Sequence, residues 1–371
     1  LSAQNAPALV WESGLDGFGK TELNKYLTGK IVNVNPYIDF YYEGLKGGAS
    51  PKDVETLFQL IYSYFTSPRI DSTGFLSLKS KMKSYLENRS NNPQSAFSDT
   101  LTVTLTNYHF RSRPLTVKML DEINPDKSLN IFKERFRDAS DFTFVFVGNI
   151  DTAVFKPLVE TYLGGLPSFS SNEKPIDLKY KNISGSINKE VQKGIESKSS
   201  VAIAYVGDMN WSRKNEHTME SLVNILDIKL RETLREDKGG TYGVYAYDQI
   251  YRIPESHYSI NFGFGCNPDR VDELVKDFYG VLDSIKTFGP DEVVMTKIKE
   301  AQQRQRELNL KKNNYWKEVI SDYLENNEDP VEILNYNNWV DELTADDIKK
   351  AANEYLGDNT VKVVLYPEEK K

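Results

Sequence analysis

Hydrophobic and polar positions alternate along several short stretches of this chain. Alternation with a period of two is typical of strands in an antiparallel sheet that has one covered face. Other stretches repeat their apolar residues every three or four positions, which is the period of an amphipathic helix. The pattern predicts strands at 31–34, 37–45, 142–147, 201–206, 241–251, 257–265 and 361–366, and helices at 51–66, 74–88, 215–236, 269–287, 290–325 and 344–356.

Part of the sequence occurs twice. ASPKDVETL at 49–57 resembles CNPDRVDEL at 266–274, and the two segments start 217 residues apart (266 − 49). FKERFRDASDFTFVFVG at 132–148 resembles KAANEYLGDNTVKVVLY at 350–366, with starting positions 218 apart (350 − 132). In the first pair, Ser or Asn before Pro marks the start of a helix. Internal similarity at one separation indicates that a structural unit has been duplicated.

The duplication predicts an α+β protein of two similar units, each an antiparallel-rich sheet packed against helices. We expect a first unit at 1–170, a linker at 171–184 rich in polar residues, and a second unit at 185–371. The first copy has less sequence before its helices than the second copy has. We therefore expect the first unit to lack its first strand or strands, which would precede Leu1.

Composition narrows the class of function. The 371 residues are 39% hydrophobic and carry a net charge of −8 without a block of Lys or Arg, which argues against nucleic-acid binding. No apolar run reaches the roughly 18 residues of a membrane span, so we predict none. The single cysteine, Cys266, has no partner for an intrachain disulfide.

The histidines do not form a metal-binding motif. They are His109, His217 and His257. RKNEH at 213–217 comes nearest, but Arg213 stands where a first ligand would be. Arginine carries a permanent positive charge and offers no lone pair to a metal. Because a zinc site needs three suitable protein ligands, we predict no metal site in this chain.

LREDKGGTY at 234–242 holds the residues best suited to chemistry. Arg235 lies at the end of a predicted helix, two glycines follow, and Tyr242 opens the next predicted strand. Each residue alone has a structural explanation, because arginine suits a helix C-terminus and tyrosine suits a strand. Together, at one end of a sheet, their donors could hold a peptide backbone or stabilise an oxyanion. In the first copy the corresponding residues are Thr28 and Asn35, so the pair occurs once.

The sequence resembles the C-terminal half of a pitrilysin/insulinase-family zinc metallopeptidase. LREDKGGTY matches that family's arginine and tyrosine seven residues apart. FTFVFVGNIDTAVFKPLVETYLGGLPS at 142–168 resembles the strand, helix and Tyr-Leu-Gly-x-Leu-Pro that close a unit, and YFTSPRID at 64–71 also fits. The resemblance covers essentially the whole chain and is greatest to the large bacterial single-chain members.

The resemblance implies a division of labour between two halves of a chamber. An N-terminal half would hold zinc through an inverted H-x-x-E-H motif, where a glutamate takes a proton from the zinc-bound water. Arg235 would bind substrate, and Tyr242 would be both catalytic and substrate-binding. The implied partners are that catalytic half, in the same chain or a separate subunit, and a peptide substrate in the periplasm. Because H-x-x-E-H is absent here, this chain alone is expected to bind no zinc and to be inactive.

Two other functions remain open from the sequence. The chain could be the zinc-free partner subunit of a two-chain peptidase. It could also be a peptide-binding or scaffold protein that has lost catalysis, although the presence of Arg235 and Tyr242 favours a catalytic role.

Overall fold

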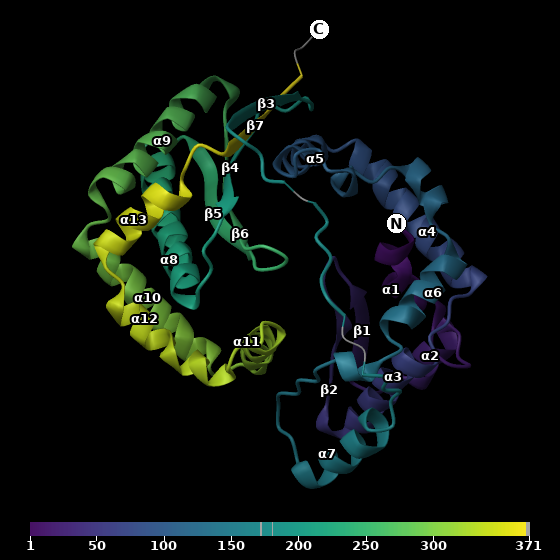
Figure 1. Cartoon of the computed structure of the whole chain (residues 1–371). Helices are drawn as coiled ribbons and strands as arrows, with labels where there is room; N and C mark the ends of the chain where they lie inside the picture. Colours follow the sequence, from purple (N-terminus) through teal and green to yellow (C-terminus); the bar gives the residue numbers. More distant parts are fainter. Residues whose placement is uncertain (171–172, 180, 369–371) are drawn as a thin grey trace. The chain divides into compact units, whose positions relative to one another are not determined.

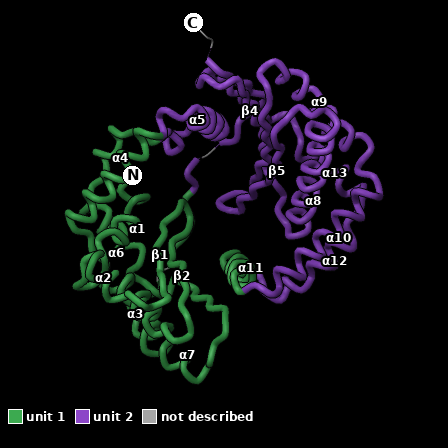
Figure 2. The backbone as a smooth tube through the Cα atoms, turned by 180° about the vertical axis from the view of Figure 1, so that it is seen from behind, with its two compact units in different colours: residues 1–88, 115–176, 313–327 green, residues 89–114, 177–312, 328–371 purple. Residues whose placement is uncertain are grey.

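The structure is a computed structural model that describes residues 1–170, 173–179 and 181–368. It contains two compact units, drawn in green and purple in Figure 2. The first comprises 1–88, 115–176 and 313–327, and the second comprises 89–114, 177–312 and 328–371. These units differ from the two continuous units predicted on either side of the linker 171–184. Residues 89–114 pack with the second unit, and residues 313–327 pack with the first. Residues 171, 172 and 180 of that linker lie outside the described residues.

The second unit contains a five-stranded mixed sheet in the order β3-β7-β4-β6-β5. Its β3–β7 pair is parallel, and the other three pairs are antiparallel. The strands contain many β-branched and aromatic residues, which suit a pleated, half-covered surface. They are β3 (Ser186–Gln192), β4 (Ser199–Asp208), β5 (Thr241–Tyr251), β6 (His257–Cys266) and β7 (Thr360–Tyr366).

Helices pack on both faces of this sheet (Figure 1). α8 (Arg213–Leu230), α9 (Val271–Phe288) and α13 (Ala345–Tyr355) bury the larger core against β4, β6 and β7. α5 (Pro93–Leu105) lies on the opposite face, where Phe97 packs against residues of β4 and β7. The part of that face formed by β5 and β6 therefore stays open in this unit. The unit also includes α10 (Glu292–Asn309) and α12 (Tyr336–Glu342).

The first unit repeats this plan with fewer strands. Its sheet has two antiparallel strands, β1 (Val32–Ile38) and β2 (Glu43–Ala49). α1 (Ser2–Ser13) packs against β1 and α6 (Pro125–Arg135), just as α8 packs against β5 and α13. The α+β prediction is confirmed. The remaining helices of this unit are α2 (Lys20–Tyr26), α3 (Val54–Thr66), α4 (Ser72–Ser90), which ends at the unit boundary, α7 (Thr152–Leu158) and α11 (Asn313–Glu325).

The structure corrects three predicted elements. The segment 142–147 is not a strand, because no neighbour pairs with it in the described residues, although its phenylalanines still pack in the core. The predicted strand 37–45 is interrupted by the turn that joins β1 to β2. The predicted helix 290–325 consists of α10 and α11, which are separated at Leu310–Lys312. The sequence reading also missed α1 and α5.

Candidate functional site

Arg235 lies in the last turn of the helix, as predicted. α8 continues into a π-helical turn, Arg231–Asp237, of the kind that often occurs at functional sites. Gly239 ends the helix with a φ of 56°, a left-handed conformation that glycine adopts without strain. Its amide donates to the Arg235 carbonyl at 3.0 Å. The Arg235 side chain is exposed, and no hydrogen bond or ion pair holds it within the described residues.

Tyr242 occupies a β-bulge at the start of β5. Thr241 pairs with Cys266, and Gly243 pairs with Gly265, so Tyr242 is an extra residue between two pairs. A bulge turns the side chain of its extra residue away from the direction that strict alternation would give. Tyr242 is accordingly 67% exposed, whereas the residues that follow it at even positions face the helices. Its hydroxyl makes a long contact of 3.5 Å with the Asn267 side chain.

Three further tyrosines extend from Tyr242 along the open face of β5. Tyr245, Tyr247 and Tyr251 are 50%, 46% and 45% exposed, and each lies at an odd position of the strand. The rings of Tyr245 and Tyr247 stack with centroids 6.1 Å apart, and Tyr251 stacks on His257 of β6. With Tyr242 these residues form an aromatic surface, which we call the tyrosine row.

Cations surround the Tyr242 end of β5. Lys198 lies near enough to the Tyr242 hydroxyl to interact with it electrostatically, and its hydrogen bond to Glu196 raises the pKa of its ammonium group. Arg270 donates to the Lys238 carbonyl at 3.3 Å and also pairs with Glu273 at 3.0 Å. Because Lys198 and Arg270 are each paired with a glutamate, Arg235 offers the donors at this end of the strand that suit a carbonyl oxygen or a carboxylate.

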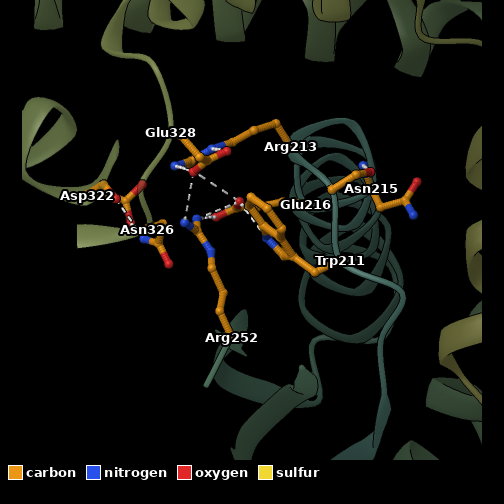
Figure 3. A network of polar contacts seen from close by, with 9 residues as sticks. Trp211, Arg213, Asn215, Glu216, Arg252, Asp322, Asn326 and Glu328 are labelled. Carbon is orange, nitrogen blue, oxygen red and sulfur yellow. Dashed lines mark hydrogen bonds and ion pairs between the residues drawn. The ribbon is translucent and has the colours of Figure 1, made fainter. Parts of the chain in front are cut away.

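A charged network anchors the other end of β5 (Figure 3). Arg252, just after β5, donates to Glu216 of α8 at 2.9 Å and is paired with Glu328 at 3.5 Å. Arg213 also pairs with Glu328. The Arg252 guanidinium lies 4.2 Å from the centre of the Trp211 ring, and the indole N–H donates to Glu216 at 3.1 Å. The network fixes the β5–β6 hairpin to the start of α8.

Comparison with known proteins identifies the family. Residues 122–302 match the family model described as the Peptidase M16 inactive domain, a range that includes Arg235 and Tyr242. This part of the chain is an inactive domain of the M16 peptidases. Its fold matches the periplasmic protease PqqL from Escherichia coli, with a TM-score of 0.85 and 20% identity over 99% of this chain and 41% of that one. The first half of the same E. coli protein matches with a TM-score of 0.76 and 12% identity, covering 99% of this chain and 83% of that structure.

The similar curated proteins are named as zinc proteases. The Arabidopsis thaliana protein named zinc protease PQQL-like is 25% identical over 287 residues, which are 72% of this chain and 30% of that protein. The chain thus spans about a third of the length of the curated relatives that it matches. The predicted membership of the pitrilysin-type M16 family is confirmed.

The residues of this M16 inactive domain do not fit a zinc ion. No cluster of three or more His, Cys, Asp or Glu side chains is placed to hold a metal in the described ranges. At RKNEH the side chains are committed elsewhere, since Arg213 pairs with Glu328 and Glu216 with Arg252. His217 is buried against Tyr336, with its ring Nε2 unpartnered. Over the described ranges, every helix is too short or too polar to cross a bilayer.

The sequence predicted Arg235 and Tyr242 as site residues but not the groups that the structure places around them. The tyrosine row was detectable, because TYGVYAYDQIY places a tyrosine at every odd position of β5 from 245 except 249. The network around Arg252 gave no local signal, since Glu216 and Glu328 are remote in sequence.

Burial raises the pKa of the Cys266 thiol to about 11, which keeps it protonated and unreactive.

Proposed function

We propose that this chain is the zinc-free C-terminal half of a zinc metalloendopeptidase that hydrolyses peptides. The chain would form half of an enclosing chamber and supply residues that position the substrate. The observation that carries the proposal is the β-bulge, which projects Tyr242 from the sheet beside the helix end that bears Arg235. The zinc-protease names of the relatives and the match to the M16 inactive domain support it. The domain limits 1–170, 171–184 and 185–371 belong to the same proposal.

Tyr242 acts as a hydrogen-bond donor to the oxygen of the scissile peptide bond. That oxygen gains negative charge as the tetrahedral intermediate forms, so a preorganised donor stabilises the transition state more than the ground state. The exposed hydroxyl can donate to substrate by exchanging its long contact with Asn267 for a hydrogen bond to that oxygen. No step through a metal is assigned to this chain, because its residues do not form a metal site.

Arg235 acts as a substrate-binding residue. Its guanidinium offers a planar fork of donors, which suits a peptide carbonyl or carboxylate better than the single ammonium of lysine. The lack of competing contacts in the described residues leaves these donors available. The partner is the catalytic N-terminal half, in the same chain or as a separate subunit. The location is the periplasm, by similarity to the periplasmic protease PqqL of E. coli.

The test is Tyr242→Phe in the enzyme that contains this chain together with its catalytic half. We expect kcat to fall by about 10²-fold with little change in KM, because one oxyanion donor is lost. Tyr85→Phe, at a tyrosine of α4 that is 65% exposed, is the control and should leave kcat unchanged. Equal kinetics for Tyr242→Phe and wild type would overturn the proposal in favour of a peptide-binding or scaffold protein. Activity that requires a separately encoded zinc-binding chain would identify the two-subunit form.

A further inference from the structure

β5 forms a long edge of the second unit's sheet. It lies last in the strand order, and no strand pairs with its outer side within the described residues. Edge strands usually carry lysine, proline or other devices that prevent pairing with another chain. β5 spans 11 residues and contains one charged residue, Asp248, and no proline. Its bulge lies at one end, so the outward amides and carbonyls from Val244 to Ile250 remain a template for an added strand.

The two faces of β5 would offer different surroundings to such a strand. On the open face, the added side chains would lie beside the tyrosine row. On the helix face, they would lie beside Val244, Ala246, Asp248 and Ile250, which alternate with the tyrosines. Tyrosine rings favour apolar or aromatic neighbours, so the open side should accept apolar residues at every second position.

Asp248 and Glu220 place negative charge on the helix side of this edge. Glu220 is on α8, close enough to Asp248 for the two carboxylates to repel each other. Neither pairs with a cation among the residues that the structure describes, since the nearby Arg252 is bound to Glu216 and Glu328. Partial desolvation and the Asp248 and Glu216 charges raise the pKa of Glu220 to about 7. Burial and Glu216 also raise the pKa of Asp248.

We propose that the free edge of β5 binds an extended peptide as an added strand, with a lysine or arginine side chain of that peptide beside Asp248 and Glu220. Main-chain hydrogen bonds to β5 hold the peptide, and the two carboxylates select its basic residue. This binding mode deepens the proposed function, on which it rests for the identity of the peptide as substrate. It assigns a preference for basic substrates to residues outside the Arg235 and Tyr242 pair.

The probe is an acetylated, amidated nonapeptide of sequence TVTVKVTVT. Its valines face one side of a strand, and its lysine and threonines face the other. Two matched peptides carry glutamate or norleucine in place of lysine. Fluorescence anisotropy with the 371-residue chain should give a Kd at least about tenfold lower for the lysine peptide than for the glutamate peptide. NMR amide exchange should show new protection at alternate residues between Val244 and Tyr251.

Protein variants test the contribution of the two carboxylates separately from main-chain pairing with β5. Asp248→Asn with Glu220→Gln should leave binding of the norleucine peptide unchanged and bring the lysine peptide to the same Kd. Asp358→Asn, at an exposed carboxylate elsewhere in the unit, should preserve the difference. N-methylation of every second peptide amide should abolish binding when the methylated amides face β5. N-methylation of the other amides, which face away from β5, should leave binding intact.

Several results would overturn the inference. Equal Kd values for the lysine and glutamate peptides would show that the two carboxylates do not select a basic residue. Amide protection outside β5 would show that the peptide binds elsewhere. Protection of β5 that rises with protein concentration in the absence of peptide would show that the edge binds a second copy instead. Normal peptide binding at β5 combined with unchanged kinetics of Tyr242→Phe would refute the proposed catalytic role but not this site.

Discussion

The ring of Tyr245 lies directly over the backbone of Gly263 on the adjacent strand. The two residues pair in register, and a Cβ atom built on Gly263 would come within 2.2 Å of the tyrosine ring and hydroxyl. Glycine at this position therefore lets an aromatic ring lie across β6. The contact fixes the first ring of the Tyr245–Tyr247 stack on the open face.

Gly263→Ala should displace Tyr245 and destabilise the protein. Overpacking of a well-fitted site costs about 1–3 kcal/mol, which urea unfolding would measure. We also expect weaker binding of the lysine nonapeptide, because the tyrosine row would lose its arrangement. Gly243→Ala is the matched control: nothing lies within 4 Å of a Cβ atom built there, so no loss is expected. Equal stability of the Gly263 variant and wild type would show that Tyr245 moves without cost.

Arg252→Met should destabilise the β5–β6 hairpin. The substitution leaves Glu216 and Glu328 with Arg213 as their one cation partner among the described residues. It also removes the stack on Trp211. Because the Arg252 side chain is only 13% exposed, we expect a loss of about 1–3 kcal/mol in the free energy of unfolding.

The control for Arg252 is Arg304→Met on α10. Arg304 pairs with Glu307 in a largely exposed ion pair, and such pairs contribute less than about 1 kcal/mol. Addition of Glu216→Gln to Arg252→Met should recover part of the loss, since it removes one of the two carboxylates that then share Arg213 and keeps the Arg213–Glu328 pair. Similar losses for Arg252→Met and Arg304→Met would contradict the anchoring role.

Glu220 should make stability depend on pH near neutrality. The folded state holds its proton up to about pH 7, whereas the ordinary value is 4.5, so the free energy of unfolding falls as pH rises from 4.5 to 7. The pKa of Asp248 is also raised, mainly by burial, so this carboxyl contributes in the same direction. Tyr336, which also borders Glu220, stays neutral in this range because burial raises its pKa to about 12.

Glu220→Gln should therefore flatten the pH profile of stability. Relative to wild type, the variant should gain stability at pH 8 and gain little at pH 4. The gain should stay below about 1 kcal/mol, because the Glu220 side chain keeps contact with solvent. Urea unfolding at the two pH values measures it, with Glu300→Gln on α10 as an exposed control. A larger gain at pH 4 than at pH 8 would reverse the assigned direction.

Arg235→Ala in the whole enzyme should raise KM by about tenfold or more with a smaller change in kcat, because the residue binds substrate. Arg235→Lys should recover little, since a single ammonium cannot replace the planar fork of donors. Arg231→Ala, in the same π-helical turn, is the control, because Arg231 already pairs with Asp227. Kinetics of Arg235→Lys that match wild type would show that charge alone is sufficient.

The amino-acid pattern was enough to predict the class of fold, the internal repeat and the positions of Arg235 and Tyr242 at a helix end and a strand start. These features follow from local periodicity, from glycine conformation and from similarity between two segments of one chain. The strand predicted at 142–147 shows the limit of that reasoning. Alternation describes which side chains are covered, but a strand also needs a hydrogen-bonded neighbour, and the described residues provide none.

The direction of the Tyr242 side chain depends on long-range strand pairing. Strict alternation would place it with Val244 and Ala246 toward the helices, and the extra residue is visible only from the pairing of β5 with β6. The same holds for Arg252 with Glu328 and for Asp248 with Glu220, because a charge meets its neighbours through folding and not through sequence distance. The chain's pattern thus fixed which residues could act, and long-range pairing fixed where their side chains meet.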